Sequence, residues 1–400
     1  MTDVAASDVA RVRAALSSGC LLHPAEGAAN TVDLAQAMAS LAGAPMGTPG
    51  PKARFVMDLV GRADHYVFVL VDGLGMNLVE ALPSDAFLRA RLVVELRAVF
   101  PSSTAPALTS IATARWPAEH AVTGWWTYLP DAGVTATILP YIERFGQKPL
   151  DQRAVPRSYA FPVGARAPGF THAFMMFTPK SIAGSVYSRY SAGDAPFSGF
   201  GRLRQGVEAI VERIASATGP TYSYLYVSDV DTAEHVYGPR SSQVARSLDD
   251  VQTQIAELAR RLDGRGRVVV TADHGQLLVD ASMTLHRDDP LVGLLSVPPT
   301  GDGRAPLFHV AEGQGDAFTR AFRERFGKDF ALLQVDEAAA MGLFGPTALS
   351  AETHRRLGDF VGIATGGAAL LYEPAPELAT MPGHHGGLSP DEMRIPLISA

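Results

Sequence analysis

The sequence predicts an α/β fold in which a mostly parallel central sheet is sandwiched by helices. Two observations predict it: short apolar, β-branched runs recur along the chain, and stretches of helical periodicity lie between them. Alternation of strands and helices is typical of a parallel sheet that is covered on both faces. The clearest predicted strands lie at residues 65–73, 171–179, 221–229, 267–275 and 330–336.

The predicted helices are recognised by apolar side chains at helical spacing. Residues 201–219 and 242–264 carry this pattern most strongly, and Gly264 is a natural stop for the second helix. Another helix is expected at 315–326. These helices would cover the sheet between successive strands.

The domain organisation is predicted to be simple. We expect an N-terminal extension at 1–60 and one main domain at 61–400. Two segments, at about 124–170 and 280–360, break the strand–helix alternation, and the second is rich in Pro and Gly. We interpret both as inserted cap segments.

The composition excludes several classes of protein. Apolar residues make up 47% of the 400 residues and charged residues 19%, so a large core is expected and disorder is not. The net charge of −7 and the absence of a Lys/Arg run give no support for nucleic-acid or membrane-surface binding. A single cysteine, Cys20, excludes an intrachain disulfide and a metal site of several thiolates.

We also expect a cytoplasmic protein. No run reaches the roughly 18 apolar residues that a membrane helix needs. The first 20 residues contain early acidic residues and no continuous apolar core, unlike a secretory signal.

Acidic residues follow three of the predicted strands. Asp72, the pair Asp229 and Asp231, and Asp273 stand at these strand ends. Ligands of open α/β sheets bind outside the carboxyl ends of the strands. Each acid alone could cap a helix, but the three together predict a polar site at this edge of the sheet.

Histidines accompany these acids. His235 follows Asp231 by one helical turn, and His274 is adjacent to Asp273. A later pair, His384 and His385, stands in a Gly-rich segment. Carboxylate oxygen and imidazole nitrogen are ligands that Zn²⁺ and Mn²⁺ accept where thiolates are absent, so the pattern predicts a metal site.

A cluster of hydroxyls precedes an apolar helical run at 99–117. A helix N-terminus presents free backbone N–H groups to an anion. A Ser or Thr hydroxyl there, bound to a metal, becomes a usable nucleophile, although a simple helix cap would have the same sequence.

These segments resemble the alkaline phosphatase superfamily, and most closely its type I phosphodiesterase/nucleotide pyrophosphatase family. The motifs stand in the family's order: an acid after the first strand in "LVDGLG", "FPSSTAP", "DVDTAEH" followed by "GP", "DHG" and "GHHG". The resemblance implies an alkaline phosphatase-like fold and a phosphate-ester hydrolase that uses two divalent ions, with zinc preferred over manganese. It also implies a small-molecule phosphate ester or nucleotide as substrate, and leaves the oligomeric state open.

The resemblance also implies roles for individual residues. Thr104 would be the nucleophile and would form a phospho-threonine intermediate. One ion would be held by Asp231, His235 and His385. The other would be held by Asp72, Asp273, His274 and the Thr104 oxygen.

Two residues are predicted to contact substrate. Trp125 stands where the family carries an asparagine that donates to the phosphoryl group, and an indole has only one N–H donor. Trp125 either replaces that donor in part or forms a flat wall for the substrate; ordinary packing is the alternative. His384 would lie behind the ligands or reach the substrate.

Trp125 leaves alternatives open for the activity. A phosphodiesterase or nucleotide pyrophosphatase is the leading hypothesis. A phosphomonoesterase or a phosphonoacetate-type hydrolase on the same core is the second, and a catalytically silent binding protein is the third. The intact set of ligands and nucleophile argues against the third.

Overall fold

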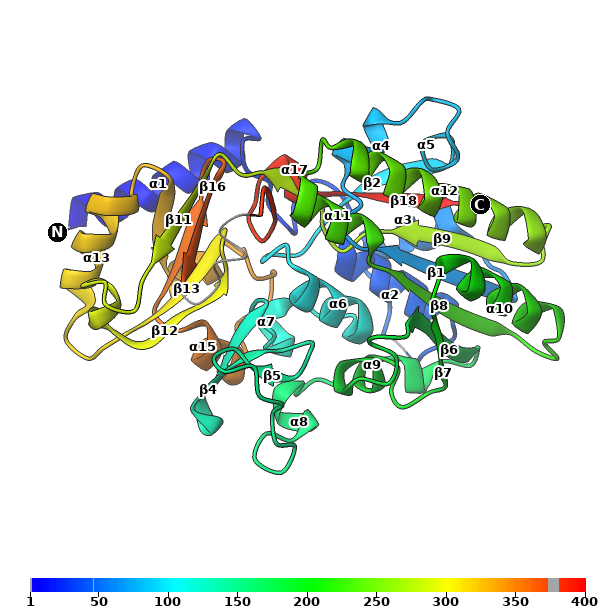
Figure 1. The fold of residues 1–400 in the computed structure, drawn as a ribbon, viewed down its shortest axis with the longest axis horizontal. Coiled ribbons are helices and arrows are strands. Elements are labelled where there is room, and N and C mark those ends of the chain that lie inside the picture. Colours follow the sequence, from blue (N-terminus) through cyan, green and yellow to red (C-terminus); the bar gives the residue numbers. More distant parts are fainter. Residues whose placement is uncertain (1, 46, 373–380) are drawn as a thin grey trace.

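The computed structural model describes residues 2–45, 47–372 and 381–400. Two seven-stranded sheets lie side by side along the long axis of the molecule (Figure 1). The larger lobe contains a mixed, mostly parallel sheet that is flanked by helices, as predicted. The smaller lobe contains an antiparallel sheet.

The strand order of the central sheet is β2-β18-β9-β1-β8-β6-β7. Strands β9, β1, β8, β6 and β7 are paired in parallel, and β18 runs antiparallel to both β9 and β2. Four of the five predicted strands belong to this sheet. The bounds are β1 (His65–Val71), β2 (Leu92–Arg97), β6 (Ala173–Pro179), β7 (Phe197–Phe200), β8 (Thr221–Val227), β9 (Arg267–Thr271) and β18 (Arg394–Ser399).

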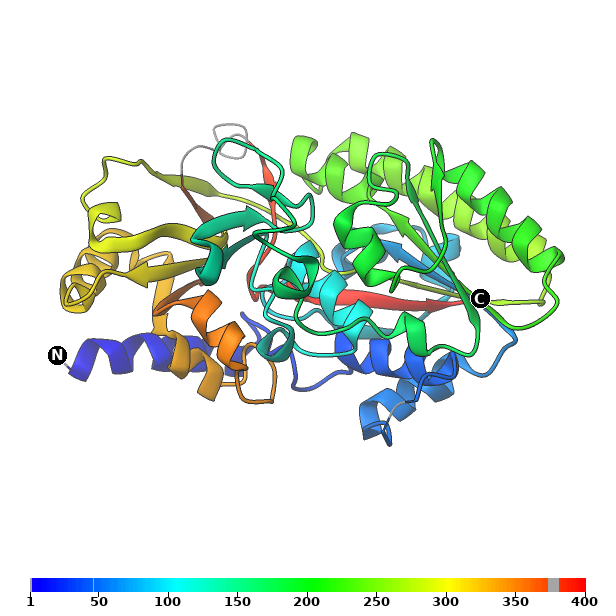
Figure 2. The ribbon, with the colours of Figure 1, turned by 90° about the horizontal axis from the view of Figure 1, so that it is seen from below.

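Helices cover both faces of this sheet. Figure 2 shows α10 and α12 (green) on one side of it and α2 and α3 (blue) on the other. The predicted helices are observed at α10 (Leu203–Ala215), α12 (Ser242–Leu262) and α13 (Gly315–Phe326). The other helices near the sheet are α2 (Thr31–Leu41), α3 (Pro51–Val60), α4 (Met76–Ala81), α5 (Phe87–Ala90), α6 (Thr104–Thr113), α9 (Val186–Ser191), α11 (Asp229–Tyr237) and α17 (Pro390–Met393).

Helix α12 shows why these segments form helices. Ser241 accepts a hydrogen bond from Val244 N and so caps the first turn. Its apolar stripe is buried, while the opposite face carries charges in water. The helix ends where Asp263 adopts a left-handed conformation, one residue before the predicted stop at Gly264.

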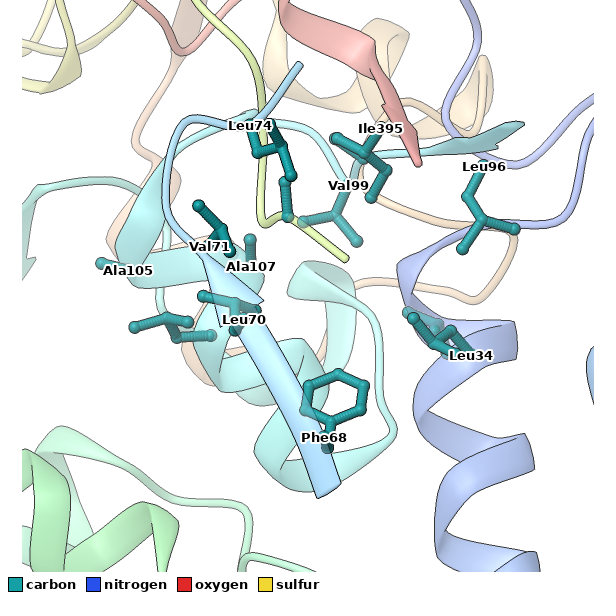
Figure 3. Close-up of a cluster of buried hydrophobic side chains, with 14 of the residues drawn as sticks. Leu34, Phe68, Leu70, Val71, Leu74, Leu96, Val99, Ala105, Ala107 and Ile395 are labelled. Atoms are coloured by element: carbon teal, nitrogen blue, oxygen red, sulfur yellow. The ribbon is translucent and has the colours of Figure 1, made fainter. Parts of the chain in front are cut away.

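The core holds helix α6 against the central sheet. Figure 3 shows Ala105 and Ala107 of α6 in one cluster with Leu70 and Val71 of β1. All four are fully buried. Small side chains let the helix approach the strand closely, which brings the first residue of α6 to the carboxyl edge of the sheet.

The second sheet has the order β14-β15-β13-β12-β3-β4-β5. It joins strands from 126–143 with strands from 295–364, so the two predicted insertions meet in one sheet. Its strands are β3 (Trp126–Leu129), β4 (Val134–Thr137), β5 (Ile142–Glu143), β12 (Leu295–Asp302), β13 (Ala305–Val310), β14 (Phe330–Gln334) and β15 (Phe360–Ala364).

The predicted strand at 330–336, which lies within the second predicted insertion, belongs to this second sheet. It forms β14, which pairs antiparallel with β15. An apolar run shows that a strand is buried and does not show which strand lies beside it. The Pro- and Gly-rich second insertion contains regular strands, since β12 continues past Pro298 and Pro299 through a register shift between Val297 and Thr300.

The remaining elements complete the smaller lobe and the junction. Two short sheets pair β10 with β17 and β11 with β16. Their bounds are β10 (Leu277–Leu278), β11 (Ala281–Leu285), β16 (Ala368–Tyr372) and β17 (Gly383–His384), and the further helices are α1 (Thr2–Ser18), α7 (Pro117–His120), α8 (Arg157–Ala160), α14 (Val335–Ala340) and α15 (Ala351–Leu357). Within the described part of the chain, no helix combines the length and the apolar character that spanning a bilayer requires.

Candidate metal-binding active site

The central sheet brings the predicted acids to one edge. Strands β9, β1 and β8 are neighbours, and Asp273, Asp72 and Asp231 follow them at their carboxyl ends. Two hydrogen bonds hold the three segments together: Asp231 N donates to Asp72 O at 3.2 Å, and Gly73 N donates to the side-chain Oδ1 of Asp273 at 3.2 Å. The arrangement follows from the parallel topology.

Two of these carboxylates are buried and only partly hydrogen-bonded. Asp72 and Asp273 are 2% and 0% exposed, and neither Asp72 Oδ1 nor Asp273 Oδ2 has a hydrogen-bond partner among the described residues. Burial, together with Asp273 and Asp231, raises the pKa of Asp72 well above its usual range. Burial also raises the pKa of Asp273. Such a cluster of acids is stable in the ionised form only beside a cation.

Three imidazoles lie beside these acids, and two of them face the carboxylates with Nε2. His235 Nε2 lies 3.4 Å from Asp231 Oδ1, and His274 Nε2 lies 3.4 Å from Asp273 Oδ2 and 3.6 Å from Asp72 Oδ1. The ring of His385 stacks on that of His274 with 3.7 Å between centroids. The helix α11 explains the first contact, because residues one turn apart lie on the same face.

Backbone carbonyls set the tautomer of all three rings. The Nδ1 atoms of His235, His274 and His385 lie 2.9, 3.2 and 3.1 Å from the carbonyl oxygens of Gly383, Gly275 and Ser102. An N–H at Nδ1 satisfies each carbonyl and leaves the Nε2 lone pair for a metal ion. Burial and the neighbouring histidines hold the pKa of His385 well below its usual range, so this ring is neutral, as a ligand must be.

The ligand atoms gather into two sets. Asp72, Asp273 and His274 form one, and Asp231, His274 and His385 form the other; the atoms of each set lie within 4.8 Å of one another. His235 stands beside the second set, with its ring centroid 5.1 Å from that of His385. The donor chemistry and the unpartnered oxygens fit two divalent ions.

Thr104 is the first residue of α6 and lies beside both sets. Its Oγ1 is 3.1 Å from His274 Nε2, and the side chain is 6% exposed and lines a cavity. The structure therefore presents a hydroxyl at a helix N-terminus, next to the ligand atoms and open to a substrate.

The two predicted substrate residues line the same cavity. The backbone N–H of Trp125 donates to Asp302 and its carbonyl accepts from Ile138 N, while Trp125 and Trp126 both line the cavity. His384 lies on β17, 6.2 Å from the ring of His235. Asp229, in contrast, is exposed in the first turn of α11 and not on a strand.

Asp302 is a site residue that the sequence did not indicate. It is buried at the end of β12 and accepts a hydrogen bond from Ser103 Oγ at 2.8 Å. Burial raises its pKa to about 6. Asp302 stands in a "GDG" turn of the second sheet, where an acid usually means a solvated turn. Gly386 accommodates it, because a Cβ there would lie 2.8 Å from the Cβ of Asp302.

A buried layer supports the ligands. Gln276 Nε2 donates to Asp231 Oδ1. Glu392 accepts hydrogen bonds from Gly387 N and Ser389 N, and so holds the turn that follows His385. Such contacts behind a metal site orient its ligands.

The cavity at the site has a volume of about 580 Å³. This volume lies within the range of small-molecule sites. It begins at Thr104, Asp72 and Asp231 and extends beyond them between the central sheet and α6. A phosphate ester could therefore place its phosphorus near Thr104 and its substituent in the cavity.

Comparisons with known proteins agree with this geometry. Residues 66–388 match the family model of type I phosphodiesterase/nucleotide pyrophosphatase. A search of the curated proteins found no match.

Solved structures share the fold. An inactive threonine-to-alanine variant of murine ectonucleotide pyrophosphatase/phosphodiesterase 5, in complex with AMP, aligns with a TM-score of 0.62 at 15% identity, over 83% of this chain and 87% of that chain. The human protein of the same name gives a TM-score of 0.62 at 14% identity, over 84% and 87%. Phosphonoacetate hydrolase from Sinorhizobium meliloti 1021, with phosphonoformate, gives 0.58 at 20% identity, over 83% and 89%.

At these identities the structures show a common fold, and the family model carries the assignment. The matched residues contain all seven predicted metal ligands, the nucleophile candidate Thr104 among them. The chain belongs to the type I phosphodiesterase/nucleotide pyrophosphatase family.

Proposed function

We propose that this protein is a two-metal-dependent phosphodiesterase or nucleotide pyrophosphatase that acts through a phospho-threonine intermediate at Thr104. The position of Thr104 carries the proposal. Its Oγ1 lies 3.1 Å from His274 Nε2, at a helix N-terminus and on the wall of the cavity. The AMP complex of murine ectonucleotide pyrophosphatase/phosphodiesterase 5 supports a nucleotide-sized ester as substrate.

The two ions would be held by the residues that the sequence indicated. Asp231, His235 and His385 would bind one, and Asp72, Asp273, His274 and Thr104 the other. Oxygen and nitrogen donors without thiolate favour zinc, with manganese as the alternative. When bound, the ions would lower the pKa of the threonine hydroxyl and neutralise charge on the phosphoryl group.

The residues of the chain then perform a double displacement. Thr104 Oγ1 attacks phosphorus in line with the ester bond, a P–O bond to threonine forms, and the alcohol leaves with its oxygen and a proton. Water next attacks the phospho-threonine, restores the hydroxyl and releases the phosphate product. The free N–H groups at the start of α6 would orient the phosphoryl oxygens.

Replacement of Thr104 tests the mechanism. The metal-loaded Thr104→Ala variant should lose more than about 10³-fold in kcat/KM for the nitrophenyl ester of thymidine monophosphate, because the covalent step is removed. Thr104→Ser should retain part of the activity. Thr113→Ser, at the far end of the same helix, is the matched control. Equal activity of Thr104→Ala and the wild type would exclude the proposal.

A phosphomonoesterase or phosphonoacetate-type hydrolase is the second candidate. Trp125 favours it, because an indole offers a single N–H donor at the place where the family carries an asparagine amide. The fold shared with phosphonoacetate hydrolase points the same way. Rates for nitrophenyl phosphate and phosphonoacetate, compared with the nitrophenyl diester, would rank the two. A protein that binds metal and turns over none of these esters would instead be a binding protein.

A further inference from the structure

The inner part of the cavity is walled by side chains of two central strands. Tyr222, Tyr224 and Tyr226 alternate along β8 and therefore project from one face of the sheet. The β6–β8 register places Phe174 opposite Tyr222 and Met176 opposite Tyr224, and both also line the cavity. The three tyrosines span about 13 Å of strand, at roughly 3.3 Å per residue.

The opposite wall comes from two helices that contact each other, α6 and α9. Leu108, Ile111 and Ala112 of α6 line it, as does Tyr187 of α9. Phe170 lines the cavity at the end of the tyrosine row away from Thr104, close to Tyr222 with 5.2 Å between ring centroids. The result is an elongated space between the sheet and its helices, beginning at the nucleophile.

Charge is confined to the end at Thr104. The ionisable groups of the lining other than tyrosine are Asp72, Asp231, Asp302, His235, His384 and His385, and none of the described lining residues is Lys or Arg. Burial raises the pKa values of Tyr222 and Tyr224, so both hydroxyls are uncharged at neutral pH. Ser188, a polar residue of the helical wall, uses its hydroxyl to donate to Ile182 O at 2.9 Å.

An anionic substituent would be unstable in this space. A second phosphate group would lose its water and find no cation along the inner wall, which is costly. An apolar substituent would instead release water from aromatic and aliphatic surface, which is favourable in proportion to the area covered. The wall therefore favours substituents that are uncharged and that have a large apolar surface.

We propose that this inner cavity binds an uncharged apolar substituent of the phosphate ester, an alkyl chain or aryl group, and that the Tyr222–Tyr224–Phe174–Met176 wall selects such esters over polyphosphates. This inference rests on the proposed function, since it assigns the substrate class of the same site. Ala112, on the facing helix, is the position where a larger side chain would fill the space.

A homologous series of esters tests the inference. Methyl, butyl and octyl nitrophenyl phosphodiesters share one leaving group and differ only in the chain. For the zinc-loaded protein, kcat/KM should rise about two- to four-fold per methylene, as expected for up to about 0.8 kcal/mol per buried CH₂, until the chain fills the cavity. Diadenosine polyphosphates should be poorer substrates than the octyl ester. A flat series, or a preference for the polyphosphates, would overturn the inference.

A variant whose side chain fills the cavity provides a second test. Ala112→Trp should abolish the gain from methyl to octyl while the methyl ester is still hydrolysed, and Ala215→Trp, exposed on α10, is the matched control. An undiminished octyl advantage in Ala112→Trp would contradict the assignment. The wild-type series remains decisive if the variant does not fold.

Calorimetry separates this inference from the proposed function. Octylphosphonate should bind the zinc-loaded wild type at least ten-fold more tightly than ethylphosphonate, with a more negative heat-capacity change. That result without turnover of any ester would refute the hydrolase and retain the apolar cavity. Hydrolysis of the methyl ester with equal binding of both phosphonates would retain the hydrolase and refute the apolar cavity.

Discussion

Arg304 and Glu392 form a two-bonded ion pair that ties the second sheet to the active-site edge of the central sheet. Arg304 Nε lies 2.6 Å from Glu392 Oε1, Nη2 lies 3.0 Å from Oε2, and both side chains are 0% exposed. Arg304 follows Asp302 in the turn after β12, while Glu392 holds the segment behind His385. One ion pair thus positions a cavity residue and a predicted ligand together.

Breaking this pair should destabilise the protein strongly. Arg304→Met would leave the carboxylate of Glu392 buried without its cation, and we expect a loss of about 3–5 kcal/mol in the free energy of unfolding. Urea unfolding at pH 7 measures it. Arg260→Met, which removes an exposed pair with Glu257, is the control and should leave the unfolding free energy almost unchanged.

The pair also predicts a pH dependence. Arg304 is the main cause that lowers the pKa of Glu392 below its usual value despite burial. A lowered carboxyl pKa contributes stability that is present above the usual pKa and is lost as the pH falls through the folded value. Wild type and Arg304→Met should therefore converge in stability under acid conditions. A constant difference between them down to pH 3 would contradict this.

Asp302 should make the stability depend on pH in the opposite direction from Glu392. Its pKa is raised to about 6 from a usual value of 3.8, so the folded state holds a proton that the unfolded state releases. Between these values stability falls as the pH rises, by roughly 3 kcal/mol in total. Asp302→Asn retains an acceptor for Ser103 without the charge. In metal-free protein, its stability relative to wild type should increase from pH 4 to 6 and then stay level.

Substitution of the predicted ligand Asp72 should change stability in opposite directions in the metal-free and the zinc-loaded protein. Asp72→Asn removes a buried charge beside Asp273 and Asp231, so it should stabilise the metal-free protein. The same change should reduce the rise in Tm that zinc produces, because a ligand is lost. Thermal unfolding with chelator and with added zinc gives both values. A variant that zinc stabilises as much as the wild type would show that Asp72 is no ligand.

Tyr226 should tune the site from behind Asp72. Its hydroxyl donates to Asp72 Oδ2 and so orients the carboxylate. Tyr226→Phe should lower zinc affinity or kcat/KM about 10- to 100-fold, the usual effect of losing such a contact. Tyr237→Phe, exposed on α11 and outside the cavity lining, is the control. Equal effects of the two changes would refute the orienting role.

Much of the fold was predictable because local patterns encode it. Apolar runs at β1, β6, β8 and β9 and the helical stripes of α10 and α12 needed no partner to be recognised. The sequence did not show which sheet the strand at 330–336 would join, because β14 and β1 have the same kind of sequence and differ only in which strand pairs with them. The prolines of β12 concealed a strand that passes them through a register shift.

The candidate site likewise contains residues that the sequence could place and residues that it could not. Asp72, Asp231 and Asp273 could be placed together because parallel strands end at a common edge, and Thr104 because its motif precedes a helix. Tyr222, Tyr224 and Tyr226 were visible as an alternating row, but their alternation shows only that they share a face. That this face borders a cavity depends on how α6 and α9 pack over it.

The sequence by itself determined four strands of the central sheet with helices α10 and α12, the family and the chemistry of the candidate ligands, since these follow from short segments whose residues are close in the chain. Only the tertiary structure decided the pairing of Arg304 with Glu392, the place of Asp302 beside Ser103 and the shape of the apolar cavity. Those features join residues that are far apart in the chain, and packing between the two sheets and their helices brings them together.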